Sequence, residues 1–191
     1  MTAFRPLALA LAFSAVAAPA MAQAASPQPA AAHAPVNPQV DYPAFAQLTV
    51  ELASLRNQRR LVWAEFSARA PAEGALLLDA RSADAFARGH LKGAVNLPFT
   101  DFTDEALAAV IGANPDRPIY IYCNNNFRDH RAPIALKRAP MALNIPTFIN
   151  LHGYGYRNVW ELADVIGTKD AGVVWEGTEV QIAAVSPLSS R

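Results

Sequence analysis

Two periods of hydrophobicity alternate along residues 45–166. Short, continuous apolar runs are typical of buried strands, and apolar residues at every third or fourth position are typical of helices packed on them. The predicted strands are 61–63, 75–79, 94–97, 118–123 and 147–151. The predicted helices are 45–60, 64–70, 83–88, 104–111, 129–139 and 158–166. Because strands and helices alternate, the sequence predicts an α/β domain with a parallel sheet.

The first 43 residues have a different character. Arg5 precedes an apolar stretch at 7–18, and small residues follow at Ala20 and Ala22. This pattern predicts a secretory signal peptide at 1–22, cleaved before Gln23, because 12 apolar residues are few for a membrane span. An uncleaved anchor is the alternative. Residues 23–43 are rich in Ala and Pro and predict a flexible linker. We therefore expect an exported protein, in a bacterium a periplasmic one, with no membrane contact after cleavage.

Composition narrows the possible partners. The folded domain is expected at 44–167, followed by a C-terminal extension at 168–191 with one possible strand at 180–185. The chain carries 16 Lys and Arg against 16 Asp and Glu, so its charge gives no reason to expect nucleic acid as a partner. One cysteine excludes an intrachain disulfide. The histidines show no metal-ligand spacing, and no glycine-rich phosphate loop is present, so we expect neither a metal nor a cofactor.

The single cysteine lies where chemistry is expected. Cys123 ends the predicted strand 118–123, and ligands of open parallel sheets bind beyond the carboxyl ends of strands. The loop that follows, with Asn124, Asn125 and Asn126, can turn backbone N–H groups toward an anion, and a helix start after it would add positive potential. Both effects favour a thiolate nucleophile. An inert, buried thiol is the alternative.

Two further stretches of sequence accompany this loop. The first contains Asp79, Arg81 and Phe86, followed by the run GHLKGAVNLP at 89–98. The second is LHGYGY at 151–156, followed by Trp160. Together with the Cys loop, these stretches resemble the rhodanese family over about residues 60–166. The resemblance implies a sheet of about five parallel strands with helices on both faces.

The resemblance also implies sulfane-sulfur transfer. Cys123 would take sulfur from a small sulfur-containing anion such as thiosulfate, or from a persulfide, and pass it to a thiophilic acceptor, which could be a protein. Residues 124–128 would bind the anion, with Phe127 at an apolar mouth and Arg128 attracting negative charge. Asp79, Arg81 and His90 would be structural. The six-residue loop 123–128 is one residue shorter than in the related dual-specificity phosphatases, which argues against phosphatase activity.

The loop departs from the family pattern at two positions. Thiosulfate enzymes of the family usually carry a basic residue second and glycine fourth, where this chain has Asn124 and Asn126. The lower positive charge predicts weaker thiosulfate binding. Two other readings stay open: a non-catalytic, protein-binding rhodanese-like module, and a redox thiol, which the lack of a second cysteine disfavours.

Overall fold

The structure is a computed structural model that describes residues 37–72, 74–129 and 132–179. The chain divides into two units, Met1–Pro38 and Gln39–Arg191, and every element below belongs to the second. The expected signal peptide at 1–22, residues 23–36 of the expected linker and the possible strand at 180–185 lie outside the described residues. Within the described ranges, no helix is both long and apolar enough to cross a bilayer.

A five-stranded parallel sheet forms the centre of the domain, as the sequence predicts. The strands are β1 (Arg60–Leu61), β2 (Leu76–Asp79), β4 (Val95–Asn96), β5 (Ile119–Tyr122) and β6 (Val159–Leu162). Their order is β1-β6-β5-β2-β4, and all pairs are parallel. β5 is therefore the central strand, and its carboxyl end lies in the middle of the edge where such sheets bind ligands.

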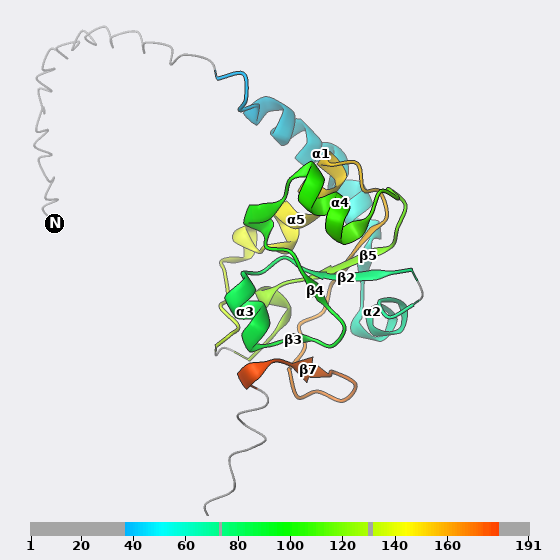
Figure 1. Cartoon of the computed structure of the whole chain (residues 1–191), viewed down its shortest axis with the longest axis vertical. Coiled ribbons are helices and arrows are strands. Elements are labelled where there is room, and N and C mark those ends of the chain that lie inside the picture. The colour runs from blue at the N-terminus through cyan, green and yellow to red at the C-terminus, as the bar shows by residue number, and fades with distance from the viewer. Residues whose placement is uncertain (1–36, 73, 130–131, 180–191) are drawn as a thin grey trace, which may run out of the picture. The chain divides into compact units, whose positions relative to one another are not determined.

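Helices cover both faces of this sheet (Figure 1). α1 (Tyr42–Gln58), α4 (Asp104–Ile111) and α5 (Asn144–Gly153) lie on one face, while α2 (Trp63–Arg69) and α3 (Ala83–Arg88) lie on the other. Each strand contributes side chains to both of these layers, because successive side chains of a strand point to opposite faces of the sheet. Ile119 and Ile121 join the core under α4 and α5, and Tyr120 and Tyr122 join the core with Phe66 of α2.

For two elements near the end of the domain, the sequence predicts the wrong type of secondary structure. The expected strand 147–151 belongs to helix α5, and the expected helix 158–166 contains strand β6. The run TFINL is short and apolar, and such runs do not separate a buried strand from a buried helix. Pro146 fits the first turn of α5, where no backbone N–H is needed. Residues of β6 alternate between the two cores, with Val159 in one and Leu162 in the other.

The expected helix at 129–139 is also wrong. Described residues 132–138 form turns and irregular chain, followed by a 3-10 turn at Ala139–Met141. Pro133 and Pro140 lack backbone donors and disfavour helical geometry in the residues before them. The helix that was expected to follow the Cys loop therefore begins only at Asn144.

Residues 168–179 of the C-terminal extension, the part that the structure describes, pack against the domain. β7 (Trp175–Glu176) pairs with β3 (His90–Leu91) in a two-stranded antiparallel sheet that the sequence did not predict. The close approach requires glycine at position 89, because a Cβ there would lie 2.4 Å from Trp175 Nε1. The first part of the C-terminal extension thus packs beside the loop that follows α3.

Candidate functional site

Cys123 lies directly after β5, at the carboxyl end of the central strand. It has the same alternation as Ile119 and Ile121, so its side chain points to the face covered by α1, α4 and α5. The residue is 1% exposed. A 3-10 turn at Asn124–Asn126 follows it and leads into Phe127.

The thiol experiences two opposing influences. Burial is the larger one and raises the pKa of Cys123 above its ordinary value. Backbone N–H groups of Asn144, Asn125 and Leu143 act against burial and lower the pKa. Two of these N–H groups come from the start of α5 rather than from a helix directly after the loop. The sulfur therefore lies at the N-terminus of a helix that begins 15 residues later in the chain than the helix the sequence predicted at 129–139.

Asn126 holds the loop together from inside. Its Oδ1 accepts hydrogen bonds from the Cys123 backbone N–H and from Asn144 Nδ2, both at 2.9 Å. Its Nδ2 donates to the carbonyls of Leu162 at 2.8 Å and Asp164 at 3.1 Å. The residue is 5% exposed. Its side chain is fully used in joining the Cys loop to α5 and to the end of β6.

The other two asparagines fix the outside of the same loop. Asn125 makes a pair of hydrogen bonds with the backbone of Lys137, through Nδ2 at 2.7 Å and Oδ1 at 3.2 Å. Asn124 Oδ1 accepts from Arg81 Nη1 at 3.3 Å. Three side chains that the sequence assigned to anion binding thus anchor the loop to three separate parts of the domain. Their role in ligand binding stays a prediction.

Asp79 and Arg81 pair at the end of β2, buried to 0% and 2% exposure. Arg81 donates from Nη2 to Asp79 Oδ2 at 2.6 Å and to the Gly89 carbonyl at 2.7 Å. Tyr122 OH donates to the same Asp79 oxygen at 2.6 Å and accepts from the Leu91 N–H. His90 Nδ1 lies 2.7 Å from the Phe86 carbonyl, and its ring stacks on Phe86. This cluster supports the Cys loop through Asn124.

Phe127 and Arg128 lie beyond the 3-10 turn. Phe127 is 1% exposed and packs edge-on against Tyr122 and Trp175, inside the core that also contains Phe66 of α2. Arg128 forms an ion pair with Asp170 and donates to the Val165 carbonyl at 3.4 Å. The pKa of Asp170 is lowered by the Gly167 N–H and by Arg128. Phe127 thus packs on Tyr122 of β5 and on Trp175, and Arg128 bonds to Asp170 and Val165 rather than to the sulfur.

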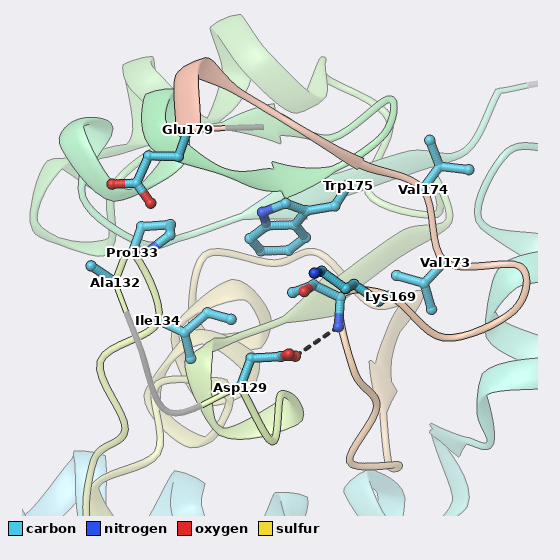
Figure 2. A pocket seen from close by; sticks show the side chains of 10 residues that line it. Asp129, Ala132, Pro133, Ile134, Lys169, Val173, Val174, Trp175 and Glu179 are labelled. Atoms are coloured by element: carbon cyan, nitrogen blue, oxygen red, sulfur yellow. Dashed lines mark hydrogen bonds between the residues drawn. The ribbon is translucent and has the colours of Figure 1, made fainter. Parts of the chain in front are cut away.

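A large hollow of about 580 Å³ lies near these two residues, on the other side of the sheet from Cys123. Its walls include Asp129, Pro133, Lys169, Trp175 and Glu179. Figure 2 shows the Trp175 indole at the centre of the lining residues. Cys123 does not line this hollow. Within the described ranges, no group of three metal-ligating side chains is present.

The protein-family model that describes the rhodanese-like domain matches residues 62–164, which is more than half of the chain. The chain belongs to the rhodanese-like domain family. The uncharacterized protein YqhL of Bacillus subtilis is 32% identical over 89 residues, which are 46% of this chain and 68% of that protein.

Solved structures similar to this rhodanese-like domain include three from bacteria. A rhodanese-like domain from Anabaena sp. is 20% identical, with a TM-score of 0.47 over 70% of this chain and 87% of the other. The protein BH2092 of Bacillus halodurans is 19% identical, with a TM-score of 0.46 over 75% and 88%. Thiosulfate sulfurtransferase of Pseudomonas aeruginosa is 25% identical, with a TM-score of 0.44 over 62% and 20%. The rhodanese-like family includes sulfurtransferases.

The sequence did not point to the buried polar cluster beside Cys123 in this rhodanese-like domain. Glu161 of β6 is 4% exposed and pairs with Arg56 of α1 at 2.6 Å. Asn144 and Thr147 of α5 are buried with it. The signal was present, because a glutamate interrupts the apolar run at 159–162, but the prediction of a helix there made Glu161 look like an ordinary exposed residue.

Proposed function

We propose that this chain transfers sulfane sulfur through a persulfide on Cys123. The observation that carries the proposal is the place of the sulfur, at the end of the central strand and beside the start of α5, where backbone N–H groups of the Cys loop and of α5 lower the pKa of the thiol against the effect of its burial. Such groups stabilise negative charge on a thiolate and on the terminal sulfur of a persulfide. The sulfurtransferases of the family support the same chemistry.

The proposed reaction has two displacements. The Cys123 thiolate attacks the outer sulfur of a donor, a bond forms between the two sulfurs, and the donor's S–S bond breaks with its electron pair leaving on sulfite or on an organic thiolate. A thiophilic acceptor, such as a thiolate or cyanide, then attacks the terminal persulfide sulfur. That step regenerates the Cys123 thiolate, so no external oxidant or reductant is consumed.

The composition of the loop favours a persulfide donor over thiosulfate. The second and fourth loop residues are the uncharged Asn124 and Asn126, and Arg128, the basic residue of the loop, is paired with Asp170. The nearest loop contact with a guanidinium is that of Asn124 with Arg81, whose charge is balanced by Asp79. A doubly charged donor would gain little attraction here. We therefore propose a small organic or protein persulfide as donor, encountered by an exported, periplasmic form of the chain.

Access to the sulfur is the main constraint on this chemistry. Cys123 is 1% exposed, so a donor reaches it only after a local opening of the surrounding segments. Burial also raises the thiol's pKa, so loss of the proton needs assistance. The same burial favours one alternative function, a rhodanese-like domain that binds a partner without catalysis.

The test compares the full chain with Cys123→Ser. Each protein is incubated with glutathione persulfide, inorganic polysulfide or thiosulfate, and its intact mass is measured before cyanide is added. We expect the wild type to gain one sulfur atom, more completely from the persulfides than from thiosulfate, and then to release thiocyanate. Cys123→Ser should do neither. A wild type that gains no sulfur from any of the three donors would contradict sulfur transfer. The remaining function would then be that of a rhodanese-like domain that binds a partner without catalysis.

A further inference from the structure

Glu161 is a buried carboxylate with one oxygen unused. Its Oε1 accepts hydrogen bonds from Arg56 Nη2 at 2.6 Å and from Asn144 Nδ2 at 3.3 Å. Its Oε2 is buried and has no hydrogen-bond partner among the described residues. Buried acceptors are nearly always paired, so an unpaired carboxylate oxygen in a core needs an explanation.

The sheet places this carboxylate next to Cys123. Glu161 pairs in register with Ile121 of β5, and Cys123 lies two positions farther along, on the same face. Strand spacing and rise then separate the two Cα atoms by roughly 8 Å, so the two side chains are neighbours on one face of the sheet. Sγ and Oε2 are not hydrogen-bonded to each other in this structure, so a direct proton transfer requires the two atoms to approach. Asn144 contacts both groups, because its backbone N–H faces Sγ and its side chain donates to Glu161 Oε1.

In the part of the chain that the structure describes, few other charged groups lie on the elements around the sulfur. Arg56 approaches Glu161 from α1, the loop residues 124–126 are uncharged, and the first turn of α5 carries no acidic residue. Asp164, which follows β6, accepts the Trp63 N–H through its carboxylate. Among the described residues, the negative charge of Glu161 raises the pKa of Cys123, after the larger effect of burial.

We propose that Glu161 is the proton acceptor for the Cys123 thiol. This inference rests on the proposed sulfur transfer and names the group that activates it. The proton leaves Sγ and binds Oε2, which converts a thiol and a carboxylate into a thiolate and a carboxylic acid. The proton stays on Oε2 while the persulfide forms. It returns to Sγ after the acceptor has taken the outer sulfur and the Cys123 thiolate has been regenerated.

The physical reason is conservation of charge inside a buried site. Sending the proton to solvent would leave two negative groups, Glu161 and the thiolate, close together in a core with one arginine beside them. Moving it to Glu161 leaves the net charge unchanged. The negative charge only shifts, from a carboxylate paired with Arg56 to a sulfur that faces three N–H groups.

The test is the pH profile of Cys123 reactivity in the full chain. With an internal acceptor, the rate of persulfide formation should be nearly constant between pH 6 and 8, for a donor whose own ionisation does not change in that range. If the proton must reach solvent, the rate should rise about tenfold per pH unit. Because this profile is measured on the wild type, a steep rise would overturn the proposal without any variant.

Glu161→Gln separates proton acceptance from a purely electrostatic role. Loss of the acceptor should lower the rate at pH 7 at least about tenfold and make the profile steep. If Glu161 acts only as a nearby negative charge, its removal should increase the rate instead, which would overturn the proposal, as would an unchanged rate. Glu51→Gln, on an exposed position of α1, is the matched control and should behave as wild type.

Iodoacetamide alkylation keeps this test distinct from the proposed function. The same two profiles can be measured with it, because alkylation reports the thiolate and needs no sulfur donor. A flat wild-type profile with no sulfur gained from any donor would support Glu161 as acceptor and contradict sulfur transfer. Sulfur gain together with a steep wild-type profile would support sulfur transfer and contradict Glu161 as the proton acceptor.

Discussion

Two pairs of arginine and carboxylate lie on opposite faces of the same sheet, and both carboxylates are buried, while Arg81 is buried and Arg56 is half-buried. Asp79 and Arg81 belong to the face of Tyr122, and Glu161 and Arg56 belong to the face of Cys123. In the first pair, both carboxylate oxygens of Asp79 and the three guanidinium nitrogens of Arg81 have hydrogen-bond partners. In the second, Glu161 Oε2 and Arg56 Nε are buried without partners among the described residues.

The difference is the one expected between a structural pair and the proton acceptor that we propose. A saturated network fixes one geometry, and its members have no capacity left for a proton or a ligand. An unsaturated network is costly to keep in a core, and it leaves a group free to bind a proton or a ligand. The neighbour of the unsaturated pair is the single cysteine, and the neighbour of the saturated pair is the loop that holds it.

Asp79→Ala should have the largest effect on stability. The substitution leaves the Arg81 guanidinium buried without its counter-ion, and loss of one member of a buried pair costs about 3–5 kcal/mol. Urea unfolding followed by circular dichroism measures this loss. Asp84→Ala is the control, since Asp84 pairs with Arg88 on the surface and should leave the unfolding midpoint near that of wild type.

A double variant sharpens the same prediction. Asp79→Ala combined with Arg81→Met removes both charges and fills part of the space with apolar atoms. It should be more stable than Asp79→Ala alone, because the uncompensated charge is the main cost. If the single variant loses less than about 1 kcal/mol, the pair is not the structural anchor described above.

Tyr122→Phe should have an intermediate effect. The phenol donates to Asp79 and accepts from the Leu91 N–H, so its removal leaves that buried donor unpaired and should cost about 1–2 kcal/mol. The consequence for pH is separate. Burial holds the pKa of Tyr122 well above its ordinary value, so the folded state keeps this proton at a pH where the unfolded state loses it.

The sign of the pH effect follows from this difference. Stability falls as pH rises wherever the folded state binds more protons, so the free energy of unfolding should decrease above the ordinary tyrosine pKa of 10.0. Each such group adds a slope of about 1.4 kcal/mol per pH unit. Tyr122→Phe should make the alkaline decrease shallower in urea titrations at increasing pH. Equal slopes in the two proteins would contradict the assignment.

The fold could be predicted because its strongest signals are local. The run at 75–79 and the run at 118–123 are apolar enough to be buried strands, and both are correct to within one residue at either end. Between residues 129 and 166 the same reasoning failed. Short apolar runs such as TFINL fit either a strand or a helix. Packing against α1 and β5 determines that this run is helical, and the local sequence carries no information about that packing.

The candidate site was predictable only in part for the same reason. A cysteine after a buried strand marks the carboxyl edge of the sheet, and position alone is enough to find it. The groups around its sulfur come from Leu143 and Asn144, and its acidic neighbour Glu161 comes from another strand. These residues lie 20 to 38 positions away, so the misassigned elements hid them. The asparagines could be identified as loop residues but not as internal anchors.

Arg128→Ala should have the smallest effect, although the sequence placed Arg128 among the anion-binding residues. The guanidinium contacts Asp170 and the Val165 carbonyl, and more than half of the side chain is exposed. Surface pairs of this kind contribute little, so the unfolding midpoint should stay near that of wild type. If Arg128 attracts the sulfur donor, the Michaelis constant for thiosulfate should nevertheless rise and that for an uncharged organic trisulfide should not. An unchanged constant for both donors would remove Arg128 from the site, and the sulfur would then depend on backbone N–H groups and Glu161 alone.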